Sequence, residues 1–67
     1  MRIITYNNNI YVCEIVTLNK SKYIKIVTLD TPYYYRDGVL SEGGINNPIF
    51  VTCSFESALA EIDFIRY

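Results

Sequence analysis

Asp37-Gly38 is the strongest turn signal in this sequence, and it predicts a tight β-hairpin. A two-residue type I′ turn needs positive φ at both central positions, and Gly accepts this conformation without strain. The turn would join residues 33–36, YYYR, to residues 39–42, VLSE. The resulting register pairs Tyr33 with Glu42, Tyr34 with Ser41, Tyr35 with Leu40 and Arg36 with Val39.

This hairpin separates the three consecutive tyrosines, because neighbouring side chains of a strand point to opposite faces. We expect Tyr33 and Tyr35 to pack inward beside Leu40, with their hydroxyls at the rim. Tyr34 and Arg36 would share the other, more polar side. Tyr and Arg are enriched among the residues that dominate binding energy at interfaces, so these two are candidate partner-binding residues. The alternative is that they form a solvated stacking pair.

A hairpin is also expected at the N-terminal end of the chain. The β-rich runs 2–6 and 10–17 are separated by three asparagines, and Asn tolerates the left-handed conformations of hairpin turns. With Asn8 and Asn9 as the turn, Tyr6 would face Tyr11 and Ile4 would face Cys13.

A further hairpin would join the runs 10–17 and 22–29 through residues 18–21, LNKS. Its register pairs Val12 with Val27, Cys13 with Ile26, Glu14 with Lys25 and Ile15 with Ile24. One ion pair and three apolar pairs then coincide, which supports this register. The face predicted to be buried holds Ile4, Tyr6, Tyr11, Cys13, Ile15, Ile24 and Ile26. The opposite face mixes apolar and polar side chains, and Tyr23 on it is a candidate contact residue.

Residues 54–67 change to helical periodicity. Ser54 can cap the helix, and the acidic side chains Glu56, Glu61 and Asp63 are interpreted as a solvated face. The apolar stripe predicted to cover the sheet consists of Phe55, Ala58, Leu59, Ile62 and Ile65. Phe64 lies nearly opposite this stripe and, with Tyr67, is a candidate second contact surface. The alternative is that the last turn frays and Phe64 folds back on the domain.

Residues 43–48 have the composition of a loop, and residues 49–53 predict another strand. We therefore expect one domain over residues 1–67 with an α+β fold, in which an antiparallel sheet of four to five strands packs against one C-terminal helix. The alternative is a small SH3-like barrel with an added helix. At 67 residues the core is small, and self-association often completes such a core.

Catalysis is not expected, because the chain has no His and therefore lacks the commonest general base at neutral pH. Cys13 and Cys53 provide too few ligands for a zinc site, so neither a metal nor a cofactor is expected. The first residues lack the apolar run of a signal peptide, and no segment is long enough for a membrane span. These features predict a cytoplasmic protein whose cysteines stay reduced.

Charge is distributed unevenly along the chain, although the net charge is only -1. Residues 1–36 carry five basic side chains and two acidic ones, whereas residues 37–67 carry five acidic and one basic. The small net charge argues against general binding to duplex DNA. Binding to single-stranded nucleic acid remains the alternative function, with bases stacking on exposed tyrosines beside Lys22, Lys25 and Arg36.

The function expected from these features is that of a small non-catalytic protein-interaction module. It would bind a protein partner or a second copy of itself and act by occluding a larger target. The Ile-, Asn- and Tyr-rich composition suggests an inhibitor or accessory protein of phage or mobile-element origin. The predicted partner-binding residues are Tyr23, Tyr34, Arg36, Phe64 and Tyr67.

Overall fold

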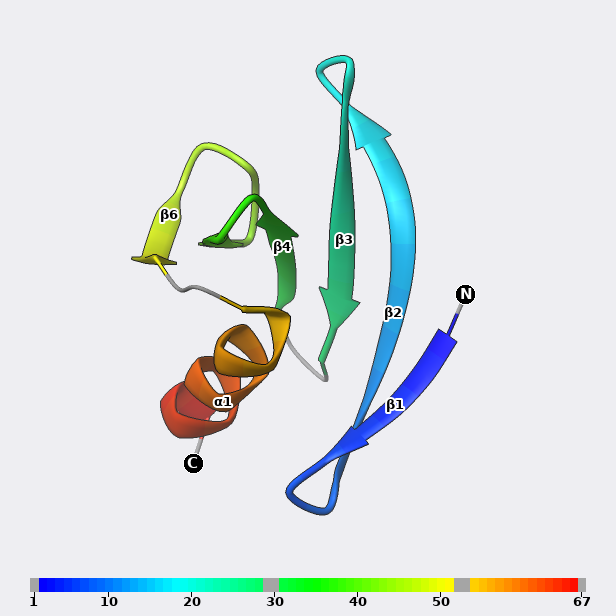
Figure 1. The fold of residues 1–67 in the computed structure, drawn as a ribbon, viewed down its shortest axis with the longest axis vertical. Coiled ribbons are helices and arrows are strands. Elements are labelled where there is room, and N and C mark those ends of the chain that lie inside the picture. The colour runs from blue at the N-terminus through cyan, green and yellow to red at the C-terminus, as the bar shows by residue number, and fades with distance from the viewer. Residues whose placement is uncertain (1, 29–30, 52–53, 67) are drawn as a thin grey trace.

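The computed structural model describes residues 2–28, 31–51 and 54–66. Within these residues the elements are β1 (Arg2–Tyr6), β2 (Asn9–Leu18), β3 (Ser21–Val27), β4 (Pro32–Arg36), β5 (Val39–Glu42), β6 (Pro48–Val51) and α1 (Phe55–Arg66). The strands form one antiparallel sheet in the order β1-β2-β3-β4-β5-β6, with the helix after it (Figure 1). The α+β class is thus confirmed.

The expected number of strands is wrong, because the described residues form six strands rather than four to five. The sheet is open, so the alternative of a small SH3-like barrel is wrong as well. The sixth strand begins at Pro48, whose missing N–H is tolerated at the start of an edge strand. This strand ends at Val51, and positions 52 and 53 of the expected strand lie outside the described residues.

The hairpin turns are made by pairs of residues with positive φ. In the hairpin of β4 and β5, Asp37 and Gly38 have φ of 50° and 83°, as a type I′ turn requires. Asn19 and Lys20 have φ of 49° and 67°, so the second hairpin turns on two residues rather than on the expected four. Both predicted registers, β2 with β3 and β4 with β5, are confirmed pair by pair.

The first hairpin turns one residue earlier than expected, at Asn7-Asn8. Ile4 therefore pairs with Tyr11 rather than with Cys13. Moving the turn by one residue moves each partner by two positions, so every side chain keeps its predicted face. The prediction of the register was wrong, but that of the face was right.

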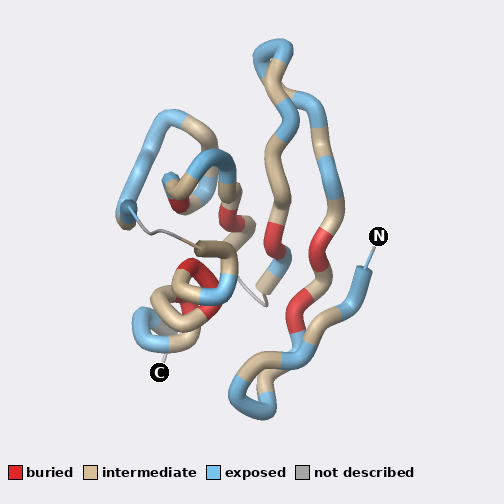
Figure 2. The backbone as a smooth tube through the Cα atoms, viewed as in Figure 1, coloured by how far each residue is buried: buried red, intermediate tan, exposed pale blue. Residues whose placement is uncertain are grey.

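The core lies where α1 packs on one face of the sheet, which we call the inner face. Figure 2 shows buried segments on both the helix and the strands. The buried apolar side chains are Tyr11, Cys13, Ile26, Tyr33 and Leu40 of the sheet and Ala58, Leu59 and Ile62 of the helix. Ile4, Tyr6, Ile24, Tyr35, Phe50 and Phe55 are partly buried against them.

The helix begins where its sequence predicts. The Ser54 hydroxyl accepts a hydrogen bond from the Ser57 N–H at 3.1 Å, which is an N-cap. Phe55 then packs edge to face against Tyr35, with ring centroids 5.5 Å apart. The predicted stripe is wrong at its last position, because Ile65 is 45% exposed.

The long β2–β3 hairpin extends past the helix. β2 has ten residues, a length of about 33 Å, and the helix packs over the part that includes Tyr11 and Cys13. The hairpin tip lies far from α1 (Figure 1). Ile15, which was predicted to be in the core, lies towards this tip and is 73% exposed. Part of the inner face is therefore left open.

Candidate interaction surfaces

The outer face of the sheet, opposite α1, gathers three of the predicted contact residues. Val16 pairs with Tyr23, and Lys25 pairs with Tyr34 in the next row. Arg36 pairs with Val39, which in turn pairs with Val51 of β6. Since these registers are continuous, one row across the sheet holds Val16, Tyr23, Arg36, Val39 and Val51.

Arg36 lies over the ring of Tyr23. Its guanidinium carbon is 5.8 Å from the ring centroid, a cation–π distance. Its Nη1 is also 3.3 Å from Oδ2 of Asp37, and the two side chains of this ion pair are 46% and 78% exposed. Sequence reasoning paired Arg36 with Tyr34. The structure pairs it with Tyr23, because the neighbour directly across the sheet is closer than the residue two positions away on the same strand.

Phe64 is not part of this surface. Phe64 lies on α1, on the other side of the sheet, and is 80% exposed. Tyr67 lies outside the described residues. Of the four predicted contact residues that the structure describes, Tyr23, Tyr34 and Arg36 share a face and Phe64 lies apart from them.

Three further apolar side chains on the outer face were missed by sequence reasoning. Ile3 is 67%, Ile10 69% and Val51 77% exposed. The signal that could have found Ile3 and Ile10 is the alternation of β2, continued through the pairs Ile3 with Val12 and Thr5 with Ile10. Val51 was harder to place, because the pairing of β5 with β6 shifts register between Leu40 and Ser41.

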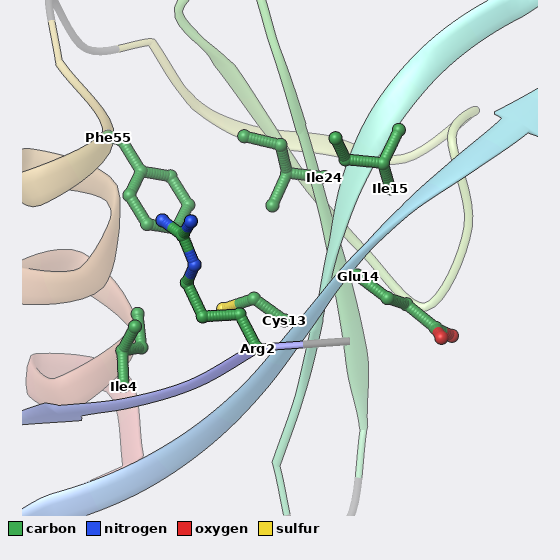
Figure 3. Close-up of a pocket in the computed structure, with 7 residues that line it drawn as sticks. All are labelled: Arg2, Ile4, Cys13, Glu14, Ile15, Ile24 and Phe55. Carbon is green, nitrogen blue, oxygen red and sulfur yellow. The ribbon is translucent and has the colours of Figure 1, made fainter.

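A groove of about 500 Å³ lies on the open part of the inner face. Its lining consists of Arg2, Ile4, Cys13, Glu14, Ile15, Ile24 and Phe55. Figure 3 shows the guanidinium of Arg2 reaching towards the side of Phe55, whereas the carboxylate of Glu14 points away from the other lining side chains. The groove is thus an apolar surface with one cationic side chain.

Cys13 in this groove is a free thiol and is buried. Burial raises the pKa of the Cys13 thiol, and the nearby positive charge of Arg2 lowers it in part. A thiol with a raised pKa is protonated at neutral pH and is a poor nucleophile. Cys13 therefore has the environment of a packed core residue, while Cys53 lies outside the described residues.

Asp63 joins the helix to the first hairpin, although its sequence context indicated a solvated carboxylate. The Asn7 side-chain amide donates to its Oδ2 at 2.8 Å, and the Asn9 amide donates to its Oδ1 at 2.6 Å. The Tyr11 hydroxyl donates to the same Oδ1 at 3.5 Å. Asn9 and Tyr11 lie two residues apart on β2 and therefore share the inner face. Two hydrogen-bond donors on the face that the helix covers could have indicated a polar contact with the helix.

Asp63→Ala is expected to lower the free energy of unfolding by about 1–3 kcal/mol, because it removes hydrogen bonds to a charged acceptor. Urea unfolding followed by circular dichroism measures this loss. Glu61→Ala, on the same helix, is the control, because Glu61 makes none of these hydrogen bonds. Equal stabilities of the two variants would contradict a fastening role for Asp63.

The chain matches no family model, and no curated protein or solved structure is significantly similar to it. Among the described residues, no helix has the length and hydropathy needed to cross a membrane. Inferences about function therefore depend on the surfaces described above.

Proposed function

We propose that this protein is a non-catalytic interaction module that binds a protein partner through the outer face of its sheet. The observation that supports the proposal best is the stacking of Arg36 on Tyr23 beside the exposed Val39 and Val51. Binding hot spots commonly combine Tyr and Arg with a surrounding apolar surface that excludes water. Because the Arg36 side chain is already held against Tyr23, it would lose less conformational entropy when a partner binds.

In this proposal Tyr34 extends the contact into the next row of the sheet. Its side chain is half-buried and lies opposite Lys25. A flat partner surface of about 800 Å² would cover both rows, which is the usual contribution of one protein to a stable interface. By covering such a surface, this module would block it from other ligands of the partner. A cytoplasmic location and a phage or mobile-element origin stay predictions from the sequence.

Single-stranded nucleic acid is the second candidate ligand. It is favoured by two cations beside two tyrosines on one face, namely Lys25 opposite Tyr34 and Arg36 over Tyr23. Each cation also has an acidic neighbour, since Glu14 pairs with Lys25 and Asp37 with Arg36. Few phosphates could therefore be neutralised, and the expected affinity is low and sensitive to salt.

Arg36→Ala and Lys22→Ala test whether the outer face is the binding surface, and separate measurements of protein capture and nucleic-acid binding distinguish the two candidates. Both substitutions remove one exposed positive charge from the sheet, but Lys22 pairs with Thr17 and lies on the inner face. Affinity capture from the native host, followed by mass spectrometry, is expected to recover a partner with the wild type and with Lys22→Ala. Arg36→Ala and Tyr34→Ala are expected to lower its recovery about tenfold or more.

Nucleic-acid binding is measured on the same proteins by fluorescence anisotropy with a single-stranded thymidine oligonucleotide at several salt concentrations. Binding that Arg36→Ala weakens and Lys22→Ala leaves unchanged, without any captured protein, would favour nucleic acid on the outer face and refute the proposal. A captured partner that is retained equally by Arg36→Ala and Lys22→Ala would refute the outer face as the binding surface.

A further inference from the structure

Two exposed apolar surfaces remain apart from the outer face, and one of them is on the helix. Phe64 and Ile65 are 80% and 45% exposed. Glu61 lies three and four residues before them, so all three side chains share one side of α1. We call Glu61, Phe64 and Ile65 the helix patch. It combines an apolar surface with a carboxylate.

The other surface is the groove on the inner face, and its properties are complementary. Ile15, Ile24 and Phe55 supply apolar surface, and Ile15 is 73% exposed. Arg2 supplies a positive charge at the same place (Figure 3). The Glu14 carboxylate is directed away from the other lining side chains, and Glu14 pairs with Lys25 of β3.

We propose that the groove binds the helix patch of a second copy of this chain, so that two copies form a reciprocal dimer. Phe64 would enter the groove between Ile15 and Phe55, and Glu61 would approach Arg2 of the other copy. In a two-fold arrangement each copy supplies one groove and one helix patch, so the contact is made twice.

The charge distribution along the chain supports this pairing. The strands that build most of the groove belong to residues 1–36, which carry the positive excess, and the helix patch belongs to residues 37–67, which carry the negative excess. Opposite charges would thus meet at both contacts. The dimer would also cover Ile15, Phe64 and Ile65, which a 67-residue monomer leaves in water.

This dimer does not depend on the outer face being a binding site. Tyr23, Tyr34 and Arg36 lie on the opposite side of the sheet from the groove, so both copies would keep their outer faces free. If the outer face does bind a partner, the dimer would present two such faces, and linkage of the two sites would increase the apparent affinity for a paired target.

The solution mass of the purified chain, measured by sedimentation equilibrium over a range of concentrations, tests the proposal. The wild type is expected to form a dimer. Phe64→Ala and Ile15→Ala are each expected to weaken dimerisation about tenfold or more. Ile10→Ala is the control, because Ile10 is 69% exposed but lies on the outer face, and its dimer should be unchanged.

Charge reversal tests the orientation of the contact. Arg2→Glu and Glu61→Arg are each expected to weaken the dimer, and the double variant is expected to restore it in part, because the attraction is re-formed with reversed signs. Circular dichroism verifies that each variant folds, and Arg2→Glu replaces Ile15→Ala as the groove variant if the latter does not fold. A monomeric wild type would refute the proposal, as would a dimer that neither Phe64→Ala nor the groove variant weakens.

Discussion

Tyr33→Ala is expected to lower the free energy of unfolding by about 3–5 kcal/mol, the range typical of truncating a buried aromatic side chain. Tyr33 is 2% exposed and packs in the core between the sheet and the helix. Its hydroxyl also donates a hydrogen bond to Oε2 of Glu42 at 3.1 Å. A domain of this size has a total stability of roughly 3–10 kcal/mol, so much of this variant should be unfolded at room temperature. Urea unfolding followed by circular dichroism measures the effect.

The two adjacent tyrosines are the matched controls. Tyr34→Ala should cost less than about 1 kcal/mol, because Tyr34 lies on the outer face away from the core. Tyr35→Ala should fall between the two, since Tyr35 is partly buried and loses its edge-to-face contact with Phe55. If Tyr33→Ala unfolds completely, Tyr33→Phe still reports on the hydroxyl, with an expected loss of about 1 kcal/mol. Equal losses at Tyr33 and Tyr34 would contradict the assignment of faces.

The hairpins could be predicted from sequence because their determinants are local. Asp37-Gly38 fixes the β4–β5 register, and the Glu14–Lys25 pair with its apolar neighbours fixes β2–β3. The first hairpin was less certain, because any two adjacent asparagines among Asn7, Asn8 and Asn9 can occupy the turn. The predicted faces were nevertheless correct, because the actual register differs from the predicted one by two residues, an even number.

The position of the helix on the sheet could not be predicted in the same way. The apolar stripe indicates which side of α1 is buried, but it does not indicate which part of β2 the helix covers. Ile15 was therefore assigned to the core, and the groove beside it was not foreseen. The hydrogen bonds of Asp63 could not be predicted either, because its partners Asn7 and Asn9 are more than fifty residues away in sequence.

The face on which three of the candidate contact residues lie could be predicted, but their contacts with one another could not. Alternation within β3 and β4 correctly placed Tyr23, Tyr34 and Arg36 on one face, because this rule is local. The stacking of Arg36 on Tyr23 depends on the pairing of β3 with β4, and no turn signal fixes that register. Apolar residues such as Ile3 and Val51 become part of the surface only when the edge strands are added to it.

Ile62→Ala is expected to lower the free energy of unfolding by about 2–5 kcal/mol, because it leaves a cavity between the helix and the sheet. Ile62 is fully buried, as is its neighbour Ala58 one turn earlier. The helix has little independent stability at twelve residues, so losing its main anchor should loosen the whole of α1. Urea unfolding measures the stability, and native-state hydrogen exchange measures the opening of the helix amides.

Phe64→Ala, two residues further along the same helix, separates packing from surface chemistry. Phe64 is 80% exposed, so at concentrations where the chain is monomeric its substitution should change stability by less than about 0.5 kcal/mol. At higher concentrations the proposed dimer predicts an additional loss of apparent stability for Phe64→Ala, because dimer formation stabilises the folded state by mass action. Ile62→Ala, in contrast, should already show its full loss of stability at concentrations where the chain is monomeric. A large loss for Phe64→Ala in the monomer would mean that Phe64 packs against its own sheet, which would remove it from the helix patch.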